Sequence, residues 1–185
     1  MSPVVRTWLG FAALGSALIH LAVGATAGFP LSVLLVGFGV AELGWGIATL
    51  ATGRVLAARI VVGAALIPVL IWGATAALGS GLGVMNAQIG LPLYPMAMAA
   101  LLDIFLAATV AIALRRASNG APTPVRAASP AGWRFVIGLV VGGFLLSAIT
   151  TPALAATEVG SHAVPHGTHG VAELILPDPT GHGSH

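Results

Sequence analysis

The chain has 185 residues, of which 57% are hydrophobic and only 6% are charged, and its mean hydropathy is +1.01. A soluble domain carries about 25% charged residues, so the composition excludes a water-soluble globular fold. The sequence has no cysteine, which excludes disulfides, thiolate metal sites and a cysteine nucleophile.

Five stretches of the sequence are long and apolar enough to cross a bilayer as helices. A hydrocarbon core about 30 Å thick requires roughly 20 residues per helix, and the stretches are too long and too continuous for the strands of a β-barrel. The N-terminal stretch has no clear cleavage site, so we expect it to remain in the protein as the first span. The sequence therefore predicts an all-α integral membrane bundle of five helices. In chain order, the predicted spans are 7–27, 30–52, 58–78, 94–114 and 133–154.

Proline and glycine mark the ends of these spans. Pro30 follows a Gly-Phe turn and opens the second span, where its missing N–H has no helical partner to lose. Pro68 lies in the middle of the third span and predicts a kink there. The stretch 117–131 is rich in Ala, Ser and Pro and predicts a flexible connector. We therefore expect a transmembrane domain over residues 1–154 and a tail over residues 155–185.

The positive charges indicate an orientation in the plasma membrane. The sequence has no lysine, and in a five-span arrangement every arginine falls on the same side of the membrane. Positively charged residues concentrate on the cytoplasmic side, which predicts a cytoplasmic N-terminus and an extracytoplasmic tail. No basic patch with interleaved aromatic residues is present, so nucleic acid is not an expected partner. The arginines are Arg6, Arg54, Arg59, Arg115, Arg116, Arg126 and Arg134.

Small residues within the spans predict close contacts between helices. Gly138 and Gly142 form a G-x-x-x-G pattern in the fifth span, and the second span contains four glycines. Small residues allow helix backbones to approach each other in lipid. This pattern predicts packing and carries little information on function.

Three ionisable residues, His20, Glu42 and Asp103, lie inside the predicted spans. An ionisable group in the membrane costs at least a few kcal/mol, so each needs a partner or a function. With a rise of about 1.5 Å per residue, their depths from the outer end of each span are roughly 10, 18 and 14 Å. The three side chains are thus predicted to meet in one polar cluster. The cluster is either a metal or proton site, or a hydrogen-bonded network that fixes helix packing with one carboxyl group protonated.

The tail carries five of the six histidines of the chain. Imidazole suits Cu(II), Zn and Ni, and the short spacings bring several rings within reach of one ion. The surrounding Gly and Pro are not compatible with a regular helix. A solvated tail with incidental histidines is the alternative. The Ala153-x-Ala155 sequence resembles a signal-peptidase site, but the preceding apolar run is long for a signal, so we expect the tail to be retained. The tail histidines are His162, His166, His169, His182 and His185.

Methionines provide a further hint of copper. Met85, Met96 and Met98 fall at or near the predicted outer face, and thioether ligands favour Cu(I). Methionine is also an ordinary core or lipid-facing residue. No enzyme motif is present, neither a nucleotide-binding loop nor H-E-x-x-H nor G-x-S-x-G, so we do not expect an enzyme.

Three short sequences carry a resemblance to other proteins: Ile19-His20-Leu21-Ala22-Val23, Ala41-Glu42-Leu43-Gly44-Trp45 and Leu101-Leu102-Asp103. They resemble a group of uncharacterised small polytopic membrane proteins of high-GC Gram-positive bacteria, the actinobacteria. In that group a polar residue, often Gln, stands at the position of Glu42, and the tails are rich in Gly and His. More distantly, the few spans and the His tail are similar to small cobalt or nickel transporter subunits and to copper-resistance membrane proteins. The resemblance implies a membrane location and no specific activity.

Two functions fit these features. The first is the handling of a transition metal, copper before others, at the outer face of the membrane. In this reading the tail captures the ion and passes it to His20, Glu42 and Asp103, for uptake or for delivery to a membrane metalloenzyme. The alternative is a non-catalytic accessory subunit of a larger membrane enzyme, such as an oxidase or monooxygenase, whose catalytic subunits are then the partners. A homo-oligomer is also compatible with the sequence, whereas the absence of an inverted repeat disfavours an ion-coupled transporter of organic solutes.

Overall fold

The computed structural model describes residues 1–82, 91–120 and 132–163 and is all-helical over these ranges. Five helices are long and apolar enough to cross a membrane, which confirms the predicted fold class. A helix of 22 residues is about 33 Å long at about 1.5 Å per residue, enough for the hydrocarbon core. The helices are α1 (Pro3–Gly24), α2 (Leu31–Thr52), α3 (Ala58–Leu82), α4 (Leu93–Ser118), α5 (Gly132–Ala155) and the short α6 (Glu158–Ser161).

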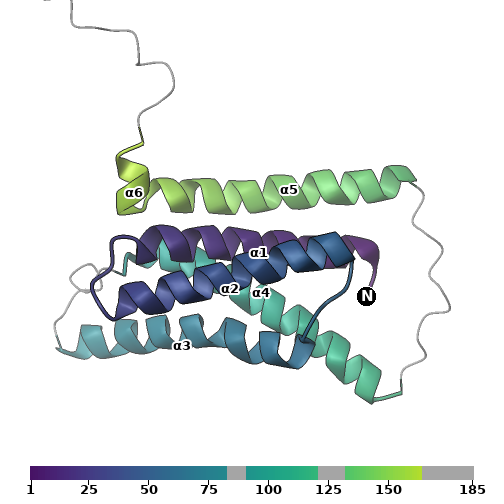
Figure 1. Ribbon diagram of the computed structural model, residues 1–185, viewed down its shortest axis with the longest axis horizontal. Helices are drawn as coiled ribbons and strands as arrows, with labels where there is room; N and C mark the ends of the chain where they lie inside the picture. The colour runs from purple at the N-terminus through teal and green to yellow at the C-terminus, as the bar shows by residue number, and fades with distance from the viewer. Residues whose placement is uncertain (83–90, 121–131, 164–185) are drawn as a thin grey trace, which may run out of the picture.

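Helix α1 lies at the centre of the bundle. It packs against α2, α4 and α5, while α3 packs mainly against α4. Successive long helices run in alternate directions (Figure 1). This arrangement brings the α1–α2 turn, the start of α4 and α6 to one end of the bundle, and the N-terminus, the α2–α3 turn and the start of α5 to the other.

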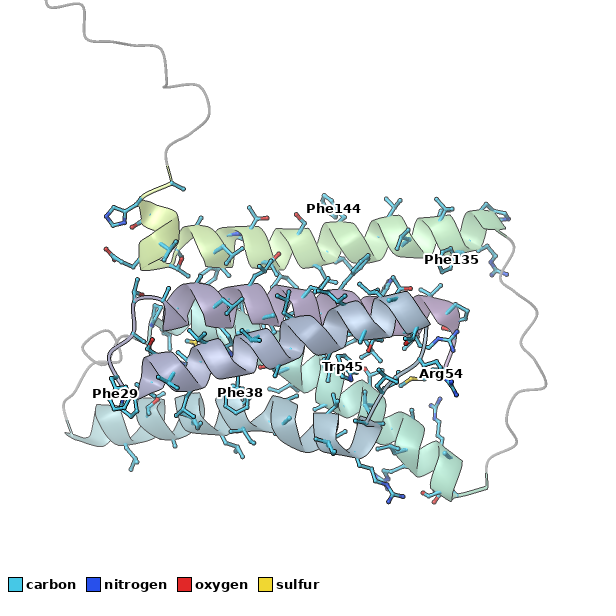
Figure 2. All side chains as sticks on the ribbon, viewed as in Figure 1. Phe29, Phe38, Trp45, Arg54, Phe135 and Phe144 are labelled. Carbon is cyan, nitrogen blue, oxygen red and sulfur yellow. The ribbon has the colours of Figure 1, made fainter. Side chains whose placement is uncertain are left out.

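The arginines of the described residues lie at the end of the bundle that holds the N-terminus. They occur at the start of α1, in and just after the α2–α3 turn, at the end of α4 and at the start of α5, and Figure 2 shows Arg54 at this end. The one-sided distribution predicted from the sequence is therefore present in the fold, apart from Arg126, which lies outside the described residues. Which end faces the cytoplasm stays a prediction.

Glycines bring α1 and α2 into close contact. A Cβ built on Gly39 would lie 2.7 Å from Cγ of Leu21 and 3.0 Å from the carbonyl oxygen of Ala17. A Cβ on Gly46 would lie 3.1 Å from the carbonyl oxygen of Gly10. The spacing of seven residues repeats every two helical turns, so both glycines face α1. Helix α2 therefore lies directly on the backbone of α1.

The G-x-x-x-G pattern of α5 accommodates a tryptophan of α1. Nε1 of Trp8 donates a hydrogen bond of 2.8 Å to the carbonyl oxygen of Gly138, and a Cβ on Gly142 would collide with the same indole nitrogen. The contact fixes α5 to one face of α1, and most of the remaining surface of α5 is exposed. The two glycines thus leave space for the Trp8 side chain of the neighbouring helix, in addition to allowing the helices to approach closely.

The observed helices differ from the predicted spans mainly at their ends. Helix α4 extends to Ser118, and α3 continues to Leu82 with Pro68 in its interior. The first part of the tail forms α6 (Glu158–Ser161), although its sequence was expected to exclude a regular helix. The physical reason is an N-cap: the hydroxyl oxygen of Thr157 accepts a hydrogen bond from the backbone N–H of Gly160, which is the interaction that starts short helices.

Candidate functional site

Three helices bring His20, Glu42 and Asp103 together in the interior of the bundle. Nδ1 of His20 lies 2.8 Å from Oε2 of Glu42, and Nε2 of His20 lies 3.9 Å from Oδ2 of Asp103. One ligand atom from each residue lies within 4.8 Å of the other two. The side chains of His20 and Asp103 are 1% and 2% exposed, and that of Glu42 is 14% exposed.

The cluster forms because each residue occupies the packed face of its helix. Glu42 stands three residues after Gly39 and four before Gly46, so it shares the α2 face that lies on α1. His20 stands on the buried face of α1, one turn after Ser16. Asp103 lies on the buried face of α4 between Ala99 and Leu106. Each polar side chain therefore lies at a helix–helix contact, a position that apolar residues occupy elsewhere in these helices.

Ser16 is a fourth member of the cluster and was not among the predicted site residues. Its hydroxyl donates a hydrogen bond of 2.6 Å to Oδ1 of Asp103 and is fully buried. The sequence signal was its position four residues before His20, which places both side chains on the same face of α1. Serine is common in membrane helices, so without the structure this spacing did not single it out.

The hydrogen bonds leave one atom of each of the three ionisable residues without a partner. Within the described residues, Nε2 of His20, Oε1 of Glu42 and Oδ2 of Asp103 are buried and accept or donate no hydrogen bond. An unsatisfied buried polar atom costs about 1–3 kcal/mol. Two of these atoms, Nε2 of His20 and Oδ2 of Asp103, face each other at 3.9 Å, so the three atoms are the ones that a ligand, an ion or a proton could reach within the cluster.

The protonation states of the cluster decide which nitrogen of His20 is available to a ligand. With Glu42 ionised and the ring neutral, Nδ1 donates to Glu42, because a carboxylate only accepts hydrogen bonds, and Nε2 carries the lone pair. That lone pair faces Oδ2 of Asp103, another acceptor, at 3.9 Å. Bonds from a metal ion to nitrogen or oxygen are about 2.0–2.2 Å long, so an ion that bonds to both atoms fits between them.

The donor set consists of one imidazole and two carboxylates. Such nitrogen and oxygen donors suit divalent transition ions, and two carboxylates balance the charge of one divalent cation. Met96 is buried in the apolar core with Ile19 and Leu102, and Met98 packs against the same core. Met85 lies outside the described residues. A thioether is therefore not part of the described cluster.

A pocket of about 210 Å³ lies beside the cluster, between α2 and α3. Glu42 and Asp103 contribute to its wall, and the rest of the lining is apolar, including Phe38, Trp45 and Ile60. Figure 2 shows Phe38 and Trp45 on the side of α2 that faces α3. The sequence did not predict this pocket, because it depends on how far α3 stands from α2.

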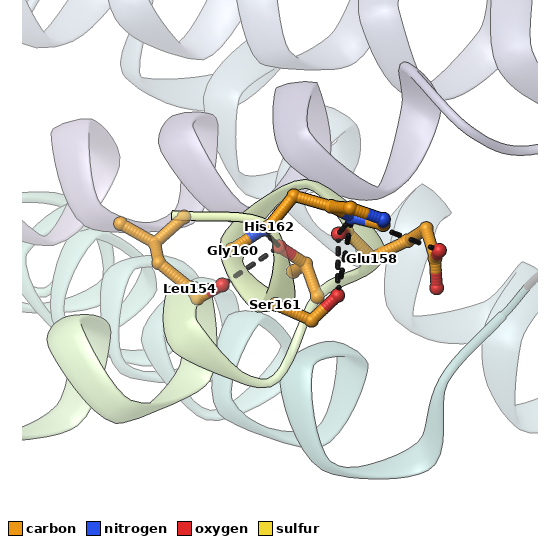
Figure 3. A network of polar contacts seen from close by, with 6 residues as sticks. Leu154, Glu158, Gly160, Ser161 and His162 are labelled. Atoms are coloured by element: carbon orange, nitrogen blue, oxygen red, sulfur yellow. Dashed lines mark hydrogen bonds and ion pairs between the residues drawn. The ribbon is translucent and has the colours of Figure 1, made fainter. Parts of the chain in front are cut away.

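Among the tail histidines, the structure describes only His162, which directly follows α6. Its Nδ1 lies 2.8 Å from the carbonyl oxygen of Glu158 and 3.8 Å from Oε1 of the same residue (Figure 3). The carbonyl only accepts, so Nδ1 donates and Nε2 of the neutral ring retains a lone pair. His162 is 75% exposed at its side chain and does not belong to the buried cluster. His166, His169, His182 and His185 lie outside the described residues.

Comparison of the chain with protein-family models, with curated proteins and with solved structures found no match.

Proposed function

We propose that this membrane protein binds a transition metal ion through His20, Glu42 and Asp103 and handles it for uptake or for delivery to a membrane metalloenzyme. The observation that carries the proposal is the set of unpartnered atoms, one on each of these three buried side chains. Cu(II) is the first ion to test, because it binds a given nitrogen and oxygen site most tightly among the divalent first-row ions. Nothing in the described part of the chain favours the accessory-subunit alternative over this one.

Ligand orientation within the cluster supports the metal role. Metal-binding histidines usually donate the second ring N–H to a carboxylate, which fixes the tautomer and raises the basicity of the ligating nitrogen. His20 makes such a contact through Nδ1 with Oε2 of Glu42, and Oε1 of the same carboxyl group is the atom that would bind the ion. Ser16 in turn holds one oxygen of Asp103 and leaves the other for a ligand. Both contacts orient donors before an ion arrives.

Metal binding by the purified protein tests the proposal. The full chain in detergent is dialysed against Cu(II), Zn or Ni, and the bound metal is measured by elemental analysis. We expect the amount of metal bound at saturation to fall in His20→Gln and Asp103→Asn to the share that the tail binds. It should stay unchanged in the matched variant Thr49→Val, whose buried hydroxyl lies on α2 outside the cluster. Unchanged binding in both cluster variants would reject the site.

The tail is proposed to capture the ion on the extracytoplasmic side. A chain that ends at Ala163 retains α6 and His162 and lacks the other tail histidines. We expect this chain to bind less metal at saturation than the full chain while it keeps the contribution of the buried cluster. Equal binding by the two chains would exclude the tail as a capture site and leave the buried site standing.

The proposed orientation can be tested because the chain has no cysteine. Single variants Ser161→Cys, in α6, and Ser118→Cys, at the end of α4, place a thiol at opposite ends of the bundle. In intact cells, a membrane-impermeant maleimide should label the first and not the second. The reverse pattern would show that the arginine-bearing end faces outward.

A further inference from the structure

The pocket between α2 and α3 has a position that the metal proposal does not explain. Helix α2 is held by α1, and α3 is held by α4, while α2 and α3 pack little against each other. Ile60 lines the pocket and is 73% exposed, so the pocket opens sideways, at the flank of the helix bundle. In a membrane this surface faces lipid, and the pocket can be entered from within the bilayer.

The pocket is large enough for an aromatic ring with substituents. Its volume is about 210 Å³, and an enclosed apolar cavity of about 150 Å³ already binds benzene. Its walls are aliphatic and aromatic except for two carboxyl groups. An inorganic ion would lose its hydration in this pocket without gaining polar contacts along most of the wall. A ligand with an extensive apolar surface would gain by burial there.

The two carboxyl groups give the pocket its charge preference. Asp103 is 2% exposed, and its Oδ2 has no hydrogen-bond partner among the described residues. Oε1 of Glu42 is also buried and unpartnered. Two acidic side chains in an apolar wall attract a cation more strongly than they would in water, because the surroundings screen the charge less.

Aromatic side chains flank the carboxyl groups on α2. Phe38 precedes Glu42 by four residues and Trp45 follows it by three, so all three share one face of the helix. The indole of Trp45 is held in place, because its Nε1 donates a hydrogen bond of 2.9 Å to the carbonyl oxygen of Leu56 in the α2–α3 turn. Aromatic faces beside carboxylates are the elements that recognise substituted ammonium groups.

We propose that the pocket binds a hydrophobic organic ammonium ion that enters from the lipid, with its charge beside Glu42 and Asp103 and its apolar part between Phe38, Trp45 and α3. This activity goes beyond metal handling, because it requires no metal ion. It uses the two carboxyl groups that the metal site also uses, so the two ligands compete.

The probe for this site is phenyltrimethylammonium, which combines one ring with one quaternary nitrogen. Its binding to the full chain in detergent is measured by equilibrium dialysis, with empty micelles as the blank and benzenesulfonate, a ring with a negative charge, as the control ligand. We expect saturable binding of the cation and none of the anion. Glu42→Gln should weaken binding of the cation by at least about tenfold, since the Coulombic attraction of one carboxylate is lost. Trp45→Leu should weaken binding of the cation by about twofold to thirtyfold, the range of one cation–π contact.

Two further variants separate this proposal from the metal site. Ala64→Leu adds bulk to the α3 wall of the pocket and leaves the three metal ligands intact, whereas His20→Gln removes a metal ligand that does not line the pocket. We expect Ala64→Leu to lose the ammonium ion and keep its Cu(II), and His20→Gln to keep the ammonium ion and bind less Cu(II), by the share of the buried cluster. Size-exclusion profiles and melting curves identify any variant that does not fold.

The proposal is overturned if folded Glu42→Gln and Trp45→Leu both bind phenyltrimethylammonium as tightly as the unmodified chain, or if the unmodified chain does not bind it. If the unmodified chain binds phenyltrimethylammonium but no Cu(II), the metal proposal is rejected and the ammonium site remains supported.

Discussion

The contact between α1 and α2 provides a direct test of how the buried cluster is assembled. Glu42 reaches His20 because Gly39, one turn earlier, allows α2 to lie on the backbone of α1. In Gly39→Ala the added Cβ would lie 2.7 Å from Cγ of Leu21, which is about 0.8 Å inside the carbon–carbon contact distance of about 3.5 Å. It would also lie 3.0 Å from the carbonyl oxygen of Ala17, a backbone atom that moves only with the helix.

The expected change in the unfolding free energy of Gly39→Ala is the sum of two opposing effects. Replacing Gly by Ala inside a helix favours folding by about 1 kcal/mol. Overpacking a tight contact costs about 1–3 kcal/mol, so Gly39→Ala should be destabilising by up to about 2 kcal/mol. Gly44→Ala is the matched control, because it lies in the same helix and a Cβ there has no neighbour within 4 Å. Gly44→Ala should therefore be stabilised by the full amount of about 1 kcal/mol that alanine contributes over glycine inside a helix.

Thermal unfolding followed by circular dichroism in detergent measures the difference between the two variants. We expect the melting temperature of Gly39→Ala to fall and that of Gly44→Ala to stay or rise. The affinity for Cu(II) should drop only in Gly39→Ala, because the wider helix spacing separates Glu42 from His20. Equal melting temperatures and equal Cu(II) affinities in the two variants would refute this account of the site.

Three further predictions concern the cluster and the helix contacts. Ser16→Ala removes the donor to Oδ1 of Asp103, and loss of such an orienting contact should weaken metal binding by about 10–100-fold, measured by competition with a chelator; unchanged affinity would mean that Ser16 does not orient the ligand. Metal affinity should fall as the pH is lowered, because protons compete for the nitrogen of His20 and for the carboxylates; dialysis at several pH values measures this, and an affinity that rises on acidification would contradict it. Trp8→Phe keeps a ring between α1 and α5 but loses the hydrogen bond to Gly138, and should cost about 1 kcal/mol of unfolding free energy; an unchanged denaturation curve would show that this bond contributes nothing.

The fold was predictable because hydropathy and helix length are local properties of the sequence. Five apolar runs of sufficient length, separated by proline, glycine and arginine, determine five helices irrespective of how they pack. The helix ends were less predictable. The N-cap of α6 depends on the hydroxyl of Thr157, which the expectation based on the Gly and Pro around the tail histidines did not consider.

The buried cluster was predictable in its members and less so in its geometry. His20, Glu42 and Asp103 stand out because ionisable residues are rare in membrane spans. Their depth estimates differ by several ångströms because they count residue positions along each helix, whereas the long side chains of His20 and Glu42 bridge the offset and meet at 2.8 Å. The role of Ser16 required the tertiary contact to Asp103.

The pocket could not be predicted from the sequence at all. The residues on α2 and α3 that line it are ordinary apolar residues of membrane helices, and no pattern in them indicates a gap. The gap exists because α2 is held by α1, α3 is held by α4, and α1 packs against α4, so it depends on three helix contacts taken together.

We propose that His20, Glu42 and Asp103 hold one metal ion together. X-ray absorption spectroscopy of the Cu(II)-loaded chain that ends at Ala163 tests this arrangement, because the tail histidines other than His162 are then absent. We expect a single imidazole and carboxylate oxygens at about 2.0–2.2 Å, with the imidazole signal lost in His20→Gln. A ligand set that is unchanged by His20→Gln, or a chain that takes up no ion, would contradict it.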